Sequence, residues 1–308
     1  MQRSIALVFA LLLHGCSCGV LDGPGHVHDL RLLAMRADPP EQRLGPGTMP
    51  VTVTALVASP AQSVVASATW STCAQQDSAT TRCLESSPGF AVLGESMVTI
   101  GPDGAEPSIT FAPDPVLLEL LRQSDPYRGL GGLRQVVQVE LRAGEESVVG
   151  FKRVVFVLPT GMQAALNTNP VVGPVEFNDA GWAPGAPVLF TVPPPRIAGQ
   201  MMLMAPPAKN QVAVLEDKSL REEYEVRTFE GELRTLQEAW RYNFFATHGS
   251  FSPQAAGGSN LLRGDAGVEA NWSRVELEDG GSGPTTVWIV VRDGRGGENW
   301  TTRHAEAP

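Results

Sequence analysis

The chain lacks what a membrane-spanning or nucleotide-binding protein needs. After its first 15 residues it contains no apolar run approaching the roughly 20 residues of a bilayer-spanning helix. It has no Walker loop, no dinucleotide fingerprint, no GxSxG elbow and no HExxH motif. The sequence therefore offers no motif from which a catalytic activity can be assigned, and we expect no cofactor.

Basic residues are scarce relative to acidic ones. Lys and Arg together number 23 against 33 Asp and Glu, which gives a net charge of −10. A surface of this sign repels phosphate backbones and anionic lipid head groups. We therefore expect no nucleic-acid partner.

Helical periodicity is also scarce, whereas turn-forming residues are abundant, with 32 Gly and 25 Pro. Hydrophobic residues make up 43% of the chain, which is enough to build real cores. The length beyond the first 15 residues exceeds one typical domain and fits two. The composition thus favours two domains of short strands and loops.

The opening MQRSIALVFALLLHGC has a short basic start at Arg3 and an apolar run from 5 to 13, within the roughly 7–15 residues of a signal-peptide core. The following Leu-His-Gly-Cys resembles the lipobox of bacterial lipoproteins, apart from His14. In that family the cysteine thiol carries diacylglycerol and the leader is removed before it. The resemblance implies a signal peptide over 1–15 and lipidation at Cys16. Ser17, where inner-membrane lipoproteins often have Asp, implies the outer membrane; the alternative is an ordinary secretory signal with Cys16 as a bystander.

Cysteine is rare, with four in the chain. Besides Cys16 and the adjacent Cys18, only Cys73 and Cys83 remain, and in an exported protein we expect them to form a disulfide. A redox pair would more often read CxxC, and zinc would need a histidine nearby in the sequence. In the chain-entropy model, closing so short a loop contributes about 3 kcal/mol to stability.

Alternating and apolar segments predict strands along most of the chain. Val51 to Val57 alternates as a half-buried strand does, and 135–142 with 147–158 predicts a hairpin. Further strands are expected at 30–37, 64–71, 91–100, 108–111, 187–192, 201–204, 211–215, 223–228, 240–246 and 285–292, with one amphipathic helix at 115–123.

Several phrases resemble lipoproteins of myxobacteria that carry tandem immunoglobulin-like domains: LRLLAMRADPPE, RAGEESVVGFKRVVFV, NTNP, WRYNFFATHGSFS and TVWIVVRDGRGGENW. The resemblance implies an all-β fold of two tandem immunoglobulin-like β-sandwiches in the cell envelope, and no activity. The expected organisation is a flexible tether at 16–29, a first sandwich at 30–159, a linker at 160–170 and a second sandwich at 171–308. Trp70 precedes both cysteines, so the expected disulfide is a local staple and not the pin between sheets of antibody domains.

Two stretches could hold a metal. Asp293 in RDGRGG resembles a calcium loop, with Glu298 as a possible second ligand, but calcium needs about 6–8 oxygens and a simple turn is the stronger interpretation. His26-Val27-His28 could offer two nitrogens, with Asp29 beside them; a solvated tether is the stronger interpretation there.

Two other sets could carry chemistry. His248, with Ser250 and the more distant Asp265, is the nearest approach to a hydrolase site, but a strand-to-turn exit at Gly249 is the stronger interpretation of His248. Trp240, Trp288 and Trp300 could stack on sugars if exposed together; the alternation around Trp240 instead favours a place in the core.

The sequence therefore favours a non-catalytic protein of the outer membrane, held by its N-terminal lipid and facing the periplasm or the cell surface. It would bind or scaffold a protein partner in the envelope. The alternatives are a carbohydrate- or calcium-binding surface module and an envelope hydrolase with an unrecognised site.

Overall fold

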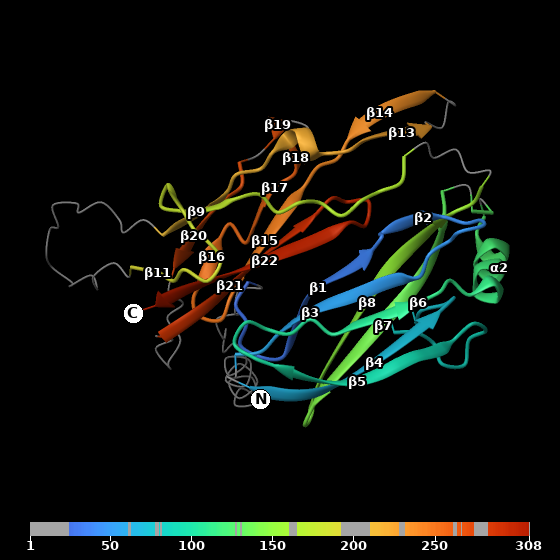
Figure 1. Ribbon diagram of the computed structural model, residues 1–308, viewed down its shortest axis with the longest axis horizontal. Helices are drawn as coiled ribbons and strands as arrows, with labels where there is room; N and C mark the ends of the chain where they lie inside the picture. Colours follow the sequence, from blue (N-terminus) through green and yellow to red (C-terminus); the bar gives the residue numbers. More distant parts are fainter. Residues whose placement is uncertain are drawn as a thin grey trace, which may run out of the picture.

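The computed structural model describes residues 25–60, 63–77, 80, 82–126, 128–129, 131–159, 165–191, 210–227, 232–260, 264–265, 267–273 and 283–307. The expected signal peptide, Cys16, Cys18 and the expected strand at 201–204 lie outside these residues. Figure 1 shows two β-sandwiches lying side by side, with a single helix at one end of the first. The expected all-β architecture of two tandem sandwiches is confirmed.

The first sandwich pairs a three-stranded sheet with a five-stranded one, and neighbours are antiparallel except β2 and β8. The small sheet has the order β1 (Arg31–Asp38), β3 (Val51–Ala58), β6 (Ser108–Phe111). The large sheet has the order β2 (Glu41–Arg43), β8 (Glu146–Val157), β7 (Leu133–Ala143), β4 (Val64–Cys73), β5 (Ala91–Ile100).

The alternation of the sequence explains how these sheets pack. In β3, Val51, Val53 and Ala55 are fully buried in the first core, where they meet Trp70 of β4. The β7–β8 hairpin is longer than expected, because its register continues to the Ala143–Glu146 pair and leaves only Gly144 and Glu145 in the turn. Gly144 has φ +61, a conformation that glycine adopts without a steric penalty.

Helix α2 (Pro115–Ser124) confirms the one predicted helix. Asp114 caps it by accepting a hydrogen bond of 2.8 Å from the Val116 backbone N–H, and Pro115 stands where no intrahelical donor is required. Leu117 and Leu118 are buried, so the helix covers one end of the first core.

The second sandwich has two five-stranded sheets. One has the order β10 (Ala180–Gly181), β9 (Val175–Phe177), β12 (Gln211–Val214), β20 (Glu269–Ser273), β16 (Ser250–Ser252). The other has the order β11 (Val188–Leu189), β22 (Glu298–Ala307), β21 (Gly283–Arg292), β15 (Arg241–Ala246), β17 (Ala255–Gly257). A 3-10 turn η1 (Lys218–Leu220) and two separate hairpins, β13 (Glu223–Arg227) with β14 (Leu233–Gln237) and β18 (Ser259–Asn260) with β19 (Gly264–Asp265), complete the described elements.

Strand β21 contains the strand expected at 285–292; it lies in the middle of its sheet and is buried on both faces. Val287, Ile289 and Val291 enter the second core, while Trp288 and Val290 face the first sandwich. Its long partner β22 was not predicted from the sequence, because ENWTTRHAEA is polar and carries little hydrophobic signal. Ten residue pairs with β21 hold it in place.

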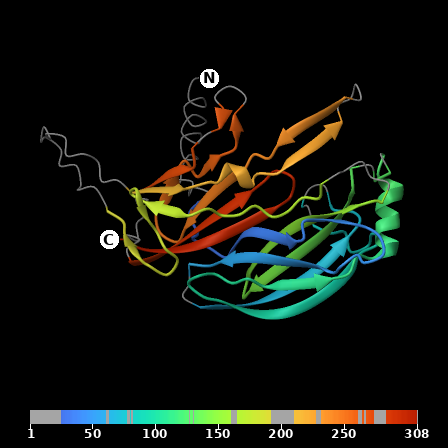
Figure 2. The ribbon, with the colours of Figure 1, turned by 45° about the horizontal axis from the view of Figure 1, so that its top comes forward.

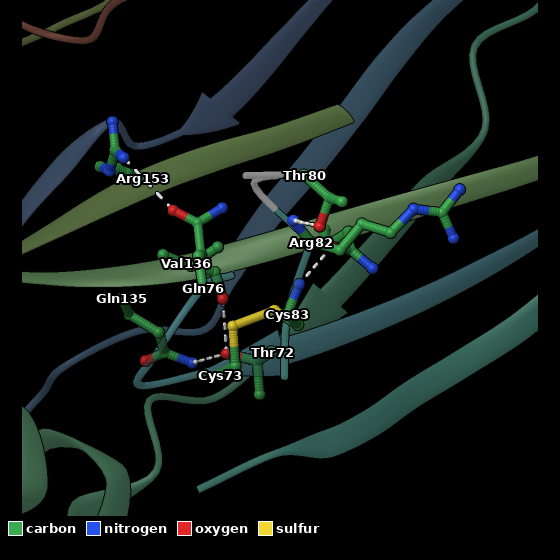
Figure 3. The surroundings of a disulfide bond; sticks show 10 residues. Thr72, Cys73, Gln76, Thr80, Arg82, Cys83, Gln135, Val136 and Arg153 are labelled. Carbon is green, nitrogen blue, oxygen red and sulfur yellow. Dashed lines mark hydrogen bonds between the residues drawn. A yellow bond between two sulfur atoms is a disulfide. The ribbon is translucent and has the colours of Figure 1, made fainter. Parts of the chain in front are cut away.

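The Cys73–Cys83 disulfide is present, with a Cα–Cα distance of 5.7 Å, and fastens the end of β4 to the following loop (Figure 3). The Cys83 N–H donates to Gln138 Oε1 at 2.7 Å, and Thr72 Oγ1 donates to the Val136 carbonyl at 2.7 Å. The disulfide is therefore a local staple and not a bond between the two sheets, as expected from the position of Trp70.

We expect the double substitution Cys73→Ala/Cys83→Ala to lower the free energy of unfolding by about 3 kcal/mol, because the unfolded chain regains the entropy that the closed loop removes. Urea unfolding followed by tryptophan fluorescence measures the loss, with reduced wild-type protein as the matched control. An unchanged unfolding midpoint in both would show that the staple contributes nothing.

Candidate functional site

The two sandwiches meet along β1 and β22, and Figure 2 shows the two bodies packed along their length. A separate hydrophobic cluster fills this junction. Its buried members come from the N-terminal segment, from β1 and β3 of the first sandwich, and from β21 of the second: Val27, Leu33, Ala34, Leu56, Ala58, Trp288 and Val290. The junction is therefore a third core and not a solvated gap.

The segment just before β1 belongs to this junction. His26 forms a parallel bridge with Ala246, and the Val27 N–H donates to the Ala246 carbonyl at 2.8 Å. His26 is 6% exposed and Val27 is completely buried. The expectation of a solvated tether through residue 29 is therefore wrong for these two residues, because Val27 fills space between the sandwiches.

Glu298, at the start of β22, links the two sandwiches through buried polar contacts. Its Oε2 atom accepts hydrogen bonds from Lys152 Nζ of β8 at 3.0 Å and from the Met35 N–H of β1 at 3.2 Å. Arg292 forms an ion pair with its other oxygen. Lys152 is 8% exposed and Glu298 is 6% exposed, so water could hardly hydrate either charge if its partner were removed.

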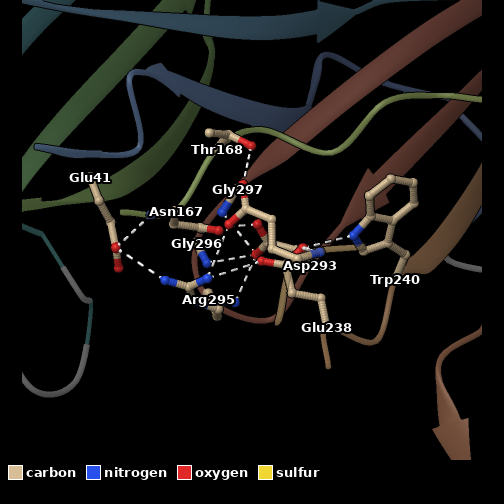
Figure 4. Close-up of polar contacts among 10 residues, drawn as sticks. Glu41, Asn167, Thr168, Glu238, Trp240, Asp293, Arg295, Gly296 and Gly297 are labelled. Atoms are coloured by element: carbon tan, nitrogen blue, oxygen red, sulfur yellow. Dashed lines mark hydrogen bonds and ion pairs between the residues drawn. The ribbon is translucent and has the colours of Figure 1, made fainter. Parts of the chain in front are cut away.

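Arg295 makes a second polar link, shown in Figure 4. Its guanidinium lies 3.3 Å from Glu41 of β2, 3.1 Å from Glu222 and 3.4 Å from Glu238. The ring of Tyr224 lies below it, 4.6 Å from the guanidinium carbon. Glu222 and Glu238 lie at the base of the β13–β14 hairpin. The Arg295 side chain therefore joins the β21–β22 turn to this hairpin and to the first sandwich.

Asp293 organises the turn that carries Arg295. Its Oδ1 atom accepts backbone hydrogen bonds from Arg295, Gly296 and Gly297 at 2.7–2.9 Å, and its Oδ2 atom accepts one from Asn167 Nδ2 at 2.9 Å. A Cβ at Gly297 would stand 2.0 Å from Asp293 Oδ2, which explains the glycine. The turn interpretation of RDGRGG is thus the one the geometry supports: both carboxylate oxygens of Asp293 are engaged, and Glu298 serves the other link.

The end of the expected linker is fastened to both sandwiches. The Asn167 N–H donates to Glu41 Oε2 at 2.8 Å. Asn169 donates from Nδ2 to the Ala37 carbonyl at 2.8 Å and accepts from the Glu298 N–H at 3.0 Å. The Asn-Thr-Asn-Pro phrase therefore acts as a connector between β1, β2 and the β21–β22 turn.

Two carboxyl groups near Arg295 have raised pKa values, chiefly because they are buried. Burial, with the nearby charges of Asp293 and Glu222, raises the pKa of Glu238, although Trp240 donates a hydrogen bond to it. Burial likewise raises the pKa of Asp293 against the opposing effect of its hydrogen bonds. Protonation of either group is therefore easier in the folded protein than in the unfolded chain.

The other candidate residues have structural roles. His248 Nδ1 lies 3.3 Å from Thr247 Oγ1 and 3.4 Å from Thr285 Oγ1, and burial lowers its pKa. No carboxylate in the described part of the chain forms an ion pair with it. Nor do the described residues contain a group of three or more His, Cys, Asp or Glu able to hold a metal ion, including those around His26 and His28.

The tryptophans do not form an exposed platform. All six are described, and five are buried: Trp70, Trp182, Trp240, Trp272 and Trp288. The core position expected for Trp240 is confirmed. Trp300 is half-buried, with the Arg36 guanidinium 4.8 Å from its ring and its Nε1 donating to Glu106 at 2.8 Å.

Comparison with known proteins adds no family. No family model matches the sequence, and no curated protein sequence matches it. Among solved structures, dimeric latent PorU from Porphyromonas gingivalis aligns over 92% of this chain and 24% of its own, with 12% identity and a TM-score of 0.23. A chimeric titin Z1Z2–Z1Z2 tandem aligns over 92% of this chain and 98% of its own, with 10% identity and a TM-score of 0.18. The chain thus spans about a quarter of the PorU chain, and neither likeness bears on its function.

We expect Glu298→Ala to destabilise the protein by about 3–5 kcal/mol, because it leaves the Lys152 ammonium buried without its partner. Chemical unfolding measures the effect. Glu306→Ala, an exposed position on the same strand, is the matched control and should change stability by less than about 0.5 kcal/mol. The double variant Lys152→Met/Glu298→Leu should recover part of the loss, because the ammonium is gone while the Met35 N–H and Arg292 still lack their acceptor. A double variant no more stable than Glu298→Ala would contradict a desolvated Lys152–Glu298 pair.

A pH series tests the acidic surroundings of Arg295. A carboxyl group whose folded-state pKa is raised stabilises the fold below its ordinary pKa, 4.5 for Glu238, and this contribution is lost as pH rises through the raised value. Glu238→Gln should therefore remove part of the fall in unfolding free energy between pH 4.5 and neutrality.

The matched control for the pH series is Glu119→Gln on α2. Hydrogen bonds from Arg122 and Gln123 lower the pKa of Glu119 to about 2, so its contribution changes only below the tested range. Equal pH profiles for wild type and Glu238→Gln would contradict a raised pKa at Glu238.

Proposed function

We propose that this chain is a lipid-anchored protein of the bacterial cell envelope that binds or scaffolds another envelope component without catalysing a reaction. The lipobox-like Leu-His-Gly-Cys sequence supports the anchor. The joined sandwiches support the binding role, because they would hold exposed strands and loops in fixed relative positions.

One observation carries this proposal: Asp293, Glu298, Trp240 and Trp288, which could have formed a site, are used within the junction and the cores. Asp293, Glu238 and Glu298 hold Arg295, the β21–β22 turn and Lys152. A surface built for recognition fits these observations better than a reactive cleft does.

The hydrolase alternative has less support because His248 lies against Thr247 and Thr285 without a carboxylate ion pair in the described residues. The carbohydrate alternative has less support because Trp240 and Trp288 are buried, and the calcium alternative because Asp293 already accepts hydrogen bonds at both oxygens.

No helix among the described residues has the length and apolar character to span a bilayer.

Substitution of the expected lipid site tests the anchor. We expect Cys16→Ala to move the protein from the membrane fraction to the soluble fraction, because alanine cannot carry the acyl chains. Each buried methylene of those chains contributes about 0.8 kcal/mol to membrane binding, so several chains anchor a protein firmly. Cell fractionation with immunoblotting measures the distribution, and Cys18→Ala is the matched control. Retention of Cys16→Ala in the membrane would contradict the anchor.

Photocrosslinking in intact cells tests the binding role. A photoreactive amino acid is placed in turn at four exposed positions spread over both sandwiches: Met97, Val116, Leu189 and Leu236. We expect a defined crosslinked partner from one or more of the four positions but not from all of them, because a binding surface covers only part of the protein. Absence of any crosslink from all four positions would contradict the binding role.

A further inference from the structure

Strand β5 stands at the edge of the large sheet of the first sandwich, paired on one side with β4 and with no other described strand on the other. In an antiparallel sheet, every second residue of an edge strand directs its N–H and C=O groups away from its neighbour. The register is irregular near Gly94, where β4 shifts between Trp70 and Ser71, and is regular from Gly94 to Ile100. The open edge is therefore the 94–100 half of β5.

The other strands that end a described sheet are protected in ways that β5 is not. Most have two to four residues, too few to template another strand. Strand β1 is long, but it is covered: its Met35 N–H donates to Glu298 and its Ala37 carbonyl accepts from Asn169. The five-residue strands of the β13–β14 hairpin carry charged side chains of both signs. Strand β5, with ten residues, is the long uncovered edge among the described sheets.

The side chains of β5 also lack the usual protection against pairing. AVLGESMVTI contains no proline, no basic residue and one acidic residue. Val92 is 56% exposed and Met97 is 69% exposed, and the adjacent Val65 of β4 is 59% exposed. Natural edge strands are commonly guarded by lysine or proline against pairing with other chains. An unguarded edge beside exposed apolar side chains is typical of a surface that binds a strand.

The charge of β5 indicates what kind of strand would pair with its open edge. Glu95 is exposed on the same face as Met97 and forms no ion pair within the described residues. A partner with Lys or Arg opposite Glu95 and an apolar residue near Met97 complements this face. A second copy of the chain fits less well, because each copy carries a net charge of −10 and offers no basic residue from β5.

We propose that the 94–100 edge of β5 binds an extended segment of a different protein by strand addition, with alternating apolar residues and a basic residue facing Glu95. The inference rests on the proposed binding role and assigns it to one surface. Backbone hydrogen bonds to β5 would supply affinity, and the Glu95–Met97 face would supply selectivity.

The test uses the full-length protein in detergent and a phage-displayed library of random peptides of about ten residues, the length of a long strand. We expect the selected peptides to alternate in hydrophobicity and to contain Lys or Arg, and their binding to protect residues 94–100 from amide hydrogen exchange. Glu95→Lys/Met97→Lys should weaken binding by at least about tenfold. The control Glu306→Lys/Val116→Lys, with the same charge change at exposed sites elsewhere, should bind within about twofold of wild type.

Three results would overturn the inference: no enriched peptide, equal binding by the Glu95→Lys/Met97→Lys variant, or protection that maps to another strand. A wild-type protein that sediments as a dimer, together with a Glu95→Lys/Met97→Lys variant that sediments as a monomer, would also overturn the inference, because a second copy would then occupy the edge. If any of these results accompanied cellular crosslinks from Val116, Leu189 or Leu236, the binding role would stand and only its assignment to β5 would fail.

Discussion

The burial of Arg295 among carboxylates is the constraint on which the arrangement of the two sandwiches depends. A charge removed from water is tolerated only when partners replace its hydration, and Glu41, Glu222 and Glu238 do so from three separate segments. A shift of any one of these segments would remove a carboxylate partner from the buried guanidinium. The polar link thus sets the geometry, while the apolar cluster around Val27 and Trp288 contributes the area removed from water.

Domains joined by a short linker ordinarily move relative to one another unless a substantial interface holds them. Here the interface combines a hydrophobic cluster, the buried Lys152–Glu298 pair and the connector around Asn167 and Asn169. A rigid pair presents its outer strands in a constant relation, as a scaffold requires. The exposed edge of β5 lies in the first sandwich, on the sheet opposite the one that contains β1 of the junction, so a strand could add there without disturbing the link.

Local features of the fold could be predicted from the sequence, whereas the junction could not. The alternation of 51–57, the hairpin around Gly144 and the capped helix at 115 each depend on residues close together in the chain. The polar link depends on pairs such as Glu41 with Arg295, which are 254 residues apart, and a single sequence carries no signal for such a distance. The turn at Asp293 was recognisable from its glycines, but its partner Asn167 was not, and polar β22 lacked the hydrophobic pattern that identifies a strand.

The account is tested most directly by the distribution of distances between the two sandwiches in solution. Spin labels carried on non-natural amino acids at Val116 of α2 and Glu269 of β20 report this distance by pulsed electron resonance, since both positions are exposed and lie on regular elements of different sandwiches. A single narrow peak is the result that one rigid body predicts. A broad or multiple distribution in the folded wild-type protein would show that the sandwiches move independently and would contradict the account.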